Sequence, residues 1–357
     1  RLQGVLYTNA TFESDVIVKT AGGSLQPTSN VGDSRALAYE IIEHIETQAS
    51  GINILGSHGV EPYLNDFSAV TSFALNAVCT PDKDIAYRLT SGIKGLSPHV
   101  PPQKLVMRFF EKQVFCNQAD VDGFISFVDQ LLGLERKKFL GVMRAIRTYV
   151  TGMYRIADDL ELAYTLLVAS IESLAQDFDG HQPSWEDYEE SKRIRIEKAL
   201  AGTDGDTAER VKTALLEIEH TSLARRFRDF AIKHTSQGFF RKEASEAKYP
   251  IGKDEMAACL SQAYVARSKY VHNLFELPRL LSLGHSFNEV MRIDRVPWLT
   301  IQGWVRLARN VIREFVMRQP VCAAAPYNYS SELSDGIQMR LAPDYWVGRP
   351  CNLSSTF

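Results

Sequence analysis

Residues 159–176 read DLELAYTLLVASIESLAQ, and this stretch constrains the fold more than any other. Its periodicity is helical, and apolar side chains occur on most sides of that helix. Such a helix cannot present one broad polar face to water, so other elements must cover it. The stretch therefore predicts a helical bundle in which residues 159–176 are buried.

The sequence on both sides of this stretch is helical from about residue 119 to residue 319. Helices are predicted at 134–155 before it, and at 208–234 after the loop and cap AGTDGDT. A polar helix at 184–200 is expected to be peripheral. A last helix, WLTIQGWVRLARNVIREFVMR at 298–318, places its apolar residues on one face and its arginines on another; the apolar residues are Trp304, Leu307, Ala308, Val311, Ile312 and Phe315.

Apolar residues at the front of the chain recur with a different period. VLYTNATFESDVIVKT at 5–20 alternates as strands do, and one amphipathic helix is expected at 34–48, with Ala38, Ile41, Ile42 and Ile45 at helical spacing. LVMRFFE at 105–111 is expected to be a strand. The sequence thus predicts an α+β chain. A strand-rich, sensory or regulatory domain would cover 1–130, a helical domain 134–320 and an irregular tail 321–357.

Composition places the chain among ordinary globular proteins, with 45% hydrophobic and 23% charged residues. No apolar run reaches the length of about 18 residues that a membrane span needs, so no membrane partner is expected. The cysteines are scattered and form no C-x-x-C pair. A reducing cytoplasm is the expected location.

The net charge of −3 conceals an uneven distribution. Residues 1–130 carry nine Lys/Arg against fourteen Asp/Glu, which gives −5. Residues 222–249 carry seven against three, and residues 291–319 carry six against two, so each has a net charge of +4. The back half can therefore attract an anion. Solvated helix faces are the alternative interpretation of each basic stretch.

The stretch YVARSKYVHNL at 264–274 contains an unexpected charge. Turns of about 100° per residue place Leu260, Ala263, Arg267, Val271 and Leu274 on one stripe, so an arginine lies where packing favours a hydrophobic residue. Arg267 is followed five residues later by His272. An ideal helix separates residues five apart by roughly 140°, so either the helix loosens near His272 or a second subunit completes the site.

The spacing of R-S-K-Y-V-H at 267–272 resembles the R-x(4-6)-H signature of HEPN domains. Together with LLVASIESLA about a hundred residues earlier, it is most similar to the ApeA-like HEPN branch. The resemblance covers roughly residues 134–320 and implies a helical HEPN bundle. The family often has Asn, Asp or His directly after the arginine, where this chain has Ser268.

The resemblance implies a metal-independent endoribonuclease, a toxin or phage-defence effector that acts on RNA as a homodimer. Arg267 would bind phosphate and His272 would be the general acid or base, supported by Ser268. Glu172 would supply the acidic position of the buried helix, where it is also the candidate structural partner of Arg267. An antitoxin or a defence-system protein would be a further partner.

Neighbouring residues extend this prediction. Tyr264 lies one turn before Arg267 and Asn273 directly follows His272, so both are candidates for RNA contact, although an aromatic residue at this spacing is usually part of the core. The basic helices are expected to contact phosphates, through Arg306, Arg309 and Arg313.

The chemistry fits these residue types without reference to a family. RNA carries its own nucleophile, the 2′-hydroxyl, so cleavage needs one group that moves a proton near neutral pH and one cation at the phosphate. The sequence contains no P-loop, no H-E-x-x-H or clustered Cys/His zinc motif, and no G-x-S-x-G elbow. No cofactor and no metal site are expected.

Two other classes of function compete with this prediction. A catalytically inactive HEPN module could bind nucleic acid or a nucleotide, or scaffold a defence complex. A purely structural interaction protein would leave Arg267 on the apolar stripe without a purpose. The ribonuclease is therefore the first expectation, and the inactive module the alternative.

Overall fold

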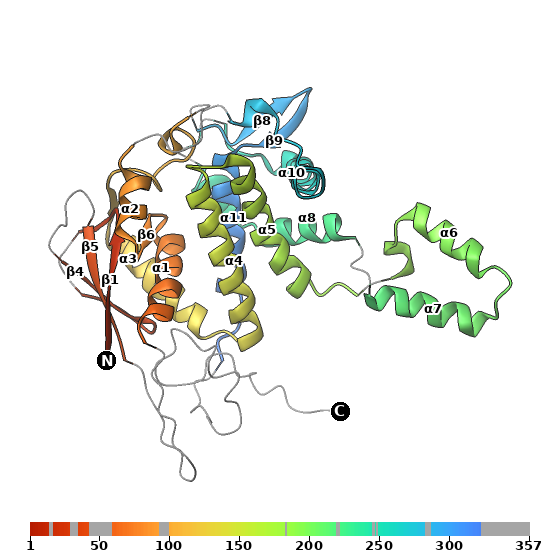
Figure 1. Cartoon of the computed structure of the whole chain (residues 1–357), viewed down its shortest axis with the longest axis horizontal. Coiled ribbons are helices and arrows are strands. Elements are labelled where there is room, and N and C mark those ends of the chain that lie inside the picture. The colour runs from red at the N-terminus through yellow and green to blue at the C-terminus, as the bar shows by residue number, and fades with distance from the viewer. Residues whose placement is uncertain are drawn as a thin grey trace, which may run out of the picture.

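The fold is known from a computed structural model, which shows an α+β chain (Figure 1). The structure describes residues 1–13, 17–28, 35–42, 59–92, 100–182, 184–218, 222–244, 247, 249–282 and 287–322. The mixed α+β class predicted from the sequence is confirmed.

An antiparallel sheet forms one side of the molecule, with strand order β3-β4-β5-β1-β6. Its strands are β1 (Leu2–Thr8), β3 (Val18–Thr20), β4 (Gly23–Pro27), β5 (Arg35–Ile41) and β6 (Cys79–Thr80). In the register of β1 and β5, Leu6 lies opposite Leu37. A short parallel pair joins β2 (Ala10–Phe12) to β7 (Val114–Cys116).

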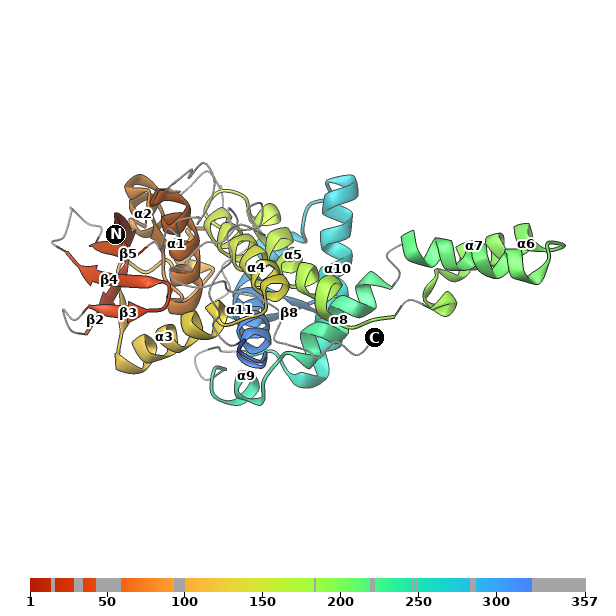
Figure 2. The ribbon, with the colours of Figure 1, turned by 90° about the horizontal axis from the view of Figure 1, so that it is seen from below.

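Helices cover this sheet and continue away from it in layers (Figures 1 and 2). The helices nearest the sheet are α1 (Glu61–Leu75), α2 (Lys83–Thr90) and α3 (Gln118–Leu132). Next come α4 (Arg136–Arg155), α5 (Leu160–Phe178) and α11 (Ile301–Met317), followed by α8 (Leu223–Lys233), α9 (Gln237–Arg241) and α10 (Lys253–Asn273). A hairpin of β8 (Val290–Ile293) and β9 (Val296–Leu299) leads into α11.

One continuous apolar core runs through these layers. The Phe73 ring of α1 meets the Tyr149 ring of α4 edge to face, with centroids 5.3 Å apart. Tyr164 of α5 meets Trp304 of α11 in the same way at 5.9 Å. Because such pairs are fully buried, they fix the front of the chain and α11 against the central helices.

The polar helix predicted at 184–200 is found in an arm that projects from the body (Figures 1 and 2). The arm contains η2 (Trp185–Asp187), α6 (Glu190–Leu200) and α7 (Gly205–Ile218). No residue of α6 is buried. The prediction that this helix is peripheral is therefore confirmed.

The helix predicted at 34–48 is wrong for its described part, since residues 35–41 form strand β5. Leu37, Tyr39 and Ile41 are buried at alternate positions, which is the period of a strand. Hydrogen bonds to β1 on one edge and β4 on the other outweigh the local helical spacing. Residues 34 and 43–48 lie outside the described residues.

Two further predicted elements are wrong. The strand expected at 105–111 is a series of turns, because Arg108 has a φ of 64° and the adjacent Phe109 and Phe110 are both buried. The helix expected at 208–234 ends with α7, and α8 starts after Ser222, which has a φ of 53°. The hairpin β8–β9 was not predicted.

The helices predicted around residues 159–176 are confirmed. α5 is buried along most of its length, and α4 and α11 lie within their predicted ranges, although Trp298 and Leu299 at the start of the predicted last helix belong to strand β9. The six apolar residues predicted for one face of α11 are all buried. No helix in the described ranges is both long enough and apolar enough for a membrane span.

Candidate functional site

Helices α5 and α10 meet at the pair predicted from the sequence. Arg267 Nη2 lies 2.8 Å from Glu172 Oε2, and the Glu172 side chain is only 5% exposed. Arg267 keeps 24% of its side chain exposed. An arginine can therefore occupy the apolar stripe of α10 because a buried carboxylate compensates its charge.

Tyr264 belongs to the same cluster. Burial, the Glu172 charge and a hydrogen bond with Glu172 raise the pKa of Tyr264 to about 12. Gln176 Nε2 donates to Glu172 Oε1 at 3.4 Å. Glu172 thus holds together three side chains, of which Arg267 alone is cationic. The structure places Tyr264 partly in the core, where it packs against Phe227.

Arg267 still has donors for another acceptor. Its contact with Glu172 uses Nη2. Its Nε is buried and has no hydrogen-bond partner among the described residues. The guanidinium group is thus anchored on one side and incompletely satisfied on the other, which suits a cation that binds an anionic ligand.

His272 lies in the last turn of α10 and is exposed. The helix stays regular through Asn273 and is closed by Leu274 in the left-handed region, whose N–H bonds to the carbonyls of Lys269 and Tyr270. Ser268 is half-buried and Asn273 is exposed. Within the described ranges, neither His272 nor Asn273 has a side-chain hydrogen bond to another residue.

The regular helix decides between the two alternatives left by the sequence. Residues five apart on an α-helix point about 140° away from each other, and no loosened turn brings His272 back toward Arg267. One chain therefore places the two groups on different faces of α10. The alternative in which the helix loosens near His272 is therefore wrong, and completion of the site by a second subunit stays a prediction.

Exposed apolar residues surround the motif. Val265, Val271, Leu274 and Phe275 are exposed, and Leu274 and Phe275 keep 76% and 61% of their surface accessible. Figure 2 shows this end of α10 at the edge of the molecule. Apolar side chains grouped at such an edge mark a surface suited to association.

The arginines of α11 occupy a second site. Arg306 donates through Nη2 to Glu289 Oε2 at 2.7 Å and through Nη1 to the Phe239 carbonyl at 2.6 Å, and its Nε bonds to Glu289 Oε1. Arg309 donates to the carbonyls of Phe73 and Ala74 at the end of α1. Both arginines are turned inward and bind their own chain, so contact with nucleic acid by this row stays a prediction.

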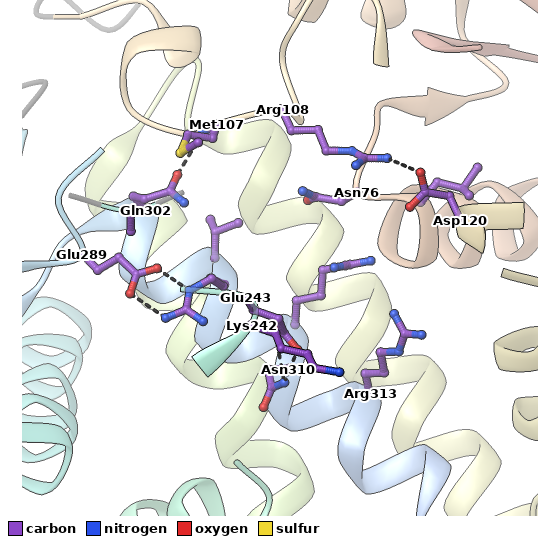
Figure 3. A pocket seen from close by; sticks show the side chains of 15 residues that line it. Asn76, Met107, Arg108, Asp120, Lys242, Glu243, Glu289, Gln302, Asn310 and Arg313 are labelled. Atoms are coloured by element: carbon purple, nitrogen blue, oxygen red, sulfur yellow. Dashed lines mark hydrogen bonds and ion pairs between the residues drawn. The ribbon is translucent and has the colours of Figure 1, made fainter. Parts of the chain in front are cut away.

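These arginines line one cavity of about 340 Å³, shown in Figure 3. α11 forms one wall, and the other comes from the end of α1, the segment at 107–108 and the start of α3. Arg306, Arg309 and Arg313 all reach it, as their common helix face predicts. The cavity therefore lies between the front of the chain and its helical part.

Sequence analysis missed Glu289, which is fully buried beneath Arg306. The hairpin β8–β9 and the Thr300 cap of α11 position it, and its carbonyl would lie 2.5 Å from a Cβ at Gly303. The sequence shows a glycine at position 303, but it does not show that the Glu289 backbone packs against this glycine.

The last features predicted from the sequence concern the cysteines and metal ligands. Cys79, Cys116 and Cys259 are free and buried, whereas Cys322 is disulfide-bonded, which cysteine usage did not predict and a reducing compartment does not favour. Within the described ranges, no three His, Cys, Asp or Glu side chains lie close enough together to hold a metal ion.

No protein-family model, curated protein or solved structure matches the chain. The resemblance to HEPN domains therefore rests on the motif at 267–272 and on the buried helix that carries Glu172.

Proposed function

We propose that the chain is a metal-independent endoribonuclease of HEPN type, in which Arg267 and His272 act on the RNA phosphate. One observation carries the proposal: Arg267 is held by the buried Glu172 at the edge of the bundle, while His272, five residues later on the same helix, has no side-chain partner among the described residues. A structural ion pair alone does not account for the Arg267 Nε, which has no hydrogen-bond partner among the described residues.

The reaction needs only groups that this site supplies. The ribose 2′-oxygen forms a bond to phosphorus, its proton passes to a base, and the bond to the 5′-oxygen breaks as that oxygen receives a proton. His272 moves the proton, and Arg267 stabilises the charge that grows on the phosphate oxygens. The products would be a 2′,3′-cyclic phosphate and a 5′-hydroxyl end.

A homodimer would complete the site. On the regular helix α10, one copy cannot direct both groups at one phosphate. The exposed apolar residues Val265, Val271, Leu274 and Phe275 border the motif and offer a surface for a second copy. A two-fold axis near these residues would bring Arg267 of one copy and His272 of the other toward a shared cleft.

The biological role follows from the resemblance alone. An RNA-cleaving HEPN chain would serve as a toxin or as an abortive-infection effector in antiviral defence, with an antitoxin or a defence-system partner. The front of the chain would then regulate the nuclease.

Purified protein incubated with total RNA and with tRNA tests the activity. Wild type is expected to cleave both in excess EDTA, to leave single-stranded DNA intact, and to produce cyclic phosphate ends. His272→Ala is expected to lower the cleavage rate by at least about a hundredfold. Ser261→Ala is the matched control, because Ser261 lies eleven residues before His272 on the same side of α10. This variant should cleave RNA like wild type.

Three outcomes would contradict the proposal. EDTA-sensitive cleavage or 5′-phosphate ends would place the chemistry at other residues. Equal rates for His272→Ala and Ser261→Ala would remove His272 from the mechanism. Tight RNA binding without cleavage would favour the alternative, an inactive module that binds nucleic acid or a nucleotide or scaffolds a defence complex.

A further inference from the structure

The cavity beside α11 has an excess of positive charge. Five basic and three acidic side chains line it, which leaves a surplus of two positive charges. The basic residues are Arg108, Lys242, Arg306, Arg309 and Arg313, and the acidic ones are Asp120, Glu243 and Glu289. A cavity with this balance favours an anion.

The partners of each charge show where the surplus lies. Arg306 is neutralised by Glu289, and Arg108 lies 3.3 Å from Asp120. Among the described residues, Arg309 has hydrogen bonds only to carbonyl oxygens, through its Nε and Nη2. Arg313 forms no ion pair or hydrogen bond with any residue in the described ranges, and its Nη2 lies beside Gly123 of α3. Arg309 and Arg313 are thus the two arginines of the cavity that have no carboxylate partner among the described residues.

The positive charges of these two guanidinium groups repel each other. Burial lowers the pKa of Arg309, and the positive charge of Arg313 lowers it further, against the opposing effects of Tyr149 and Glu243. Two cations one turn apart on α11, at positions 309 and 313, are separated by i,i+4 spacing and so point to the same region. An anion placed between them would replace this repulsion with two charge-assisted contacts.

The opposite wall offers groups for the rest of a ligand. Asn76 ends α1 in the left-handed conformation, and its Oδ1 is buried without a partner among the described residues. Arg108 Nε is also buried without a partner in those ranges. Figure 3 shows Asn76 and Arg108 on the side of the cavity toward which Arg313 extends. A ligand that carries a hydroxyl or amino group could satisfy Asn76.

We propose that this cavity binds a small phosphorylated molecule of at most nucleoside-monophosphate size. Its phosphate lies between Arg309 and Arg313, and a hydroxyl or amino group meets Asn76. The volume of about 340 Å³ is at the lower end of small-molecule sites and suits one such molecule rather than a polymer. Because its walls come from the front of the chain and from α11, the ligand would fasten these two parts together. The proposal is independent of the ribonuclease.

Calorimetric titration and thermal unfolding of the full chain test the site with defined probes. Adenosine 5′-monophosphate and ribose 5-phosphate are expected to bind and to raise the melting temperature. Adenosine and ribose, which lack the phosphate, are expected to do neither. Inorganic phosphate should bind more weakly than the esters, because it cannot reach Asn76.

Substitutions then locate the binding. Arg313→Gln is expected to weaken adenosine 5′-monophosphate binding about tenfold or more, the usual cost of losing a charged hydrogen-bond donor. Arg318→Gln is the matched control. Arg318 is the residue directly after α11, it pairs with Glu314, and it does not line the cavity. Arg313→Lys keeps the charge and provides a folded comparison if Arg313→Gln is unstable. It should bind more weakly than wild type and more tightly than Arg313→Gln.

Several results would overturn the proposal. Equal binding of adenosine and its monophosphate would show that the phosphate is not recognised. No binding of any phosphorylated probe at about 10 mM, well above even a weak dissociation constant of about 1 mM, would remove the site. Unchanged affinity in Arg313→Gln would place it elsewhere. Tighter binding of a 5′-phosphorylated RNA oligonucleotide, lost in Arg313→Gln, would make the cavity part of an RNA surface.

Discussion

Two arginine–glutamate pairs, one on α11 and one on α10, differ in how completely the arginine is satisfied. Arg306 bonds to both oxygens of the fully buried Glu289 and to a carbonyl, and its guanidinium lies 3.7 Å from the Phe239 ring centroid. Arg267 has one contact with Glu172, an unsatisfied Nε and a partly exposed side chain.

The difference separates an arginine that serves the fold from one that can also serve a ligand. A guanidinium group whose three nitrogens all have partners keeps only two of its five N–H donors for a phosphate. One that is anchored through a single nitrogen has both a fixed position and free capacity. The sequence places Arg306 on the arginine face of its helix and Arg267 on the apolar stripe of another, and only the structure shows the partners of each.

The largest expected effect tests the α11 pair. Arg306→Ala leaves the Glu289 carboxylate buried without its cation, so the free energy of unfolding should fall by about 3–5 kcal/mol. Urea denaturation with a fixed m-value measures this loss. The double change Arg306→Met with Glu289→Leu should recover only part of it, because Glu289 Oε2 also accepts from the Ile251 N–H at 3.0 Å. A loss below about 1 kcal/mol for the single change would contradict the structural role.

The second prediction tests the α10 pair through both the free energy of unfolding and the rate of RNA cleavage. Arg267→Ala should lower the free energy of unfolding by about 2 kcal/mol, less than Arg306→Ala, because Glu172 keeps Tyr264 and Gln176 as partners. RNA cleavage should nevertheless be abolished. Arg267→Ala with Glu172→Leu should regain stability without regaining cleavage.

The comparison would fail in either of two ways. If Arg267→Ala destabilised the chain more than Arg306→Ala, the partial exposure of Arg267 would not indicate spare capacity. If the stabilised double variant cleaved RNA, Arg267 would be a structural residue only. Circular dichroism melting and the RNA assay on the same preparations distinguish these cases.

The two pairs were not equally accessible to prediction. Glu172 and Arg267 lie on strongly helical stretches whose burial is evident from sequence, so a buried carboxylate facing an arginine on the apolar stripe could be expected. Glu289 lies in a hairpin without helical period, and its contact with Arg306 depends on how α11 starts. Sequence periodicity specifies which helix face is buried but not which distant loop covers it.

The same distinction explains the errors in the fold. The helices of the bundle were predicted because each carries its own apolar pattern, as in α5. Strand β5 was missed because its conformation is set by pairing with β1 and β4, which are separated from it in the chain. The turns around Phe109 and Phe110 were missed for a related reason, since both rings enter a core formed by remote helices. The same limit applies to the cavity, because Met107 and Arg108 of these turns line it.

His234, a buried group without a counter-charge among the described residues, provides the third case in the comparison. His234 packs against the rings of Phe230 and Phe315, and its Nδ1 has no partner among the described residues. Burial, together with the charges of Lys233 and Arg318, lowers the pKa of His234 to about 4. The folded chain therefore holds His234 neutral near pH 7.

This predicts how stability depends on pH. The unfolded histidine has a pKa of about 6.5, so between pH 6.5 and 4 the unfolded state binds more protons than the folded state, and stability falls as the pH falls. Between about pH 7.5 and pH 5 the loss should be on the order of 2 kcal/mol, most of it above the range in which carboxylates titrate. His234→Phe keeps a ring in contact with Phe230 and Phe315 but cannot be protonated, so its free energy of unfolding should vary less over this interval. Urea denaturation of both proteins at the two pH values measures the difference, and equal slopes would show that protonation of His234 does not oppose folding.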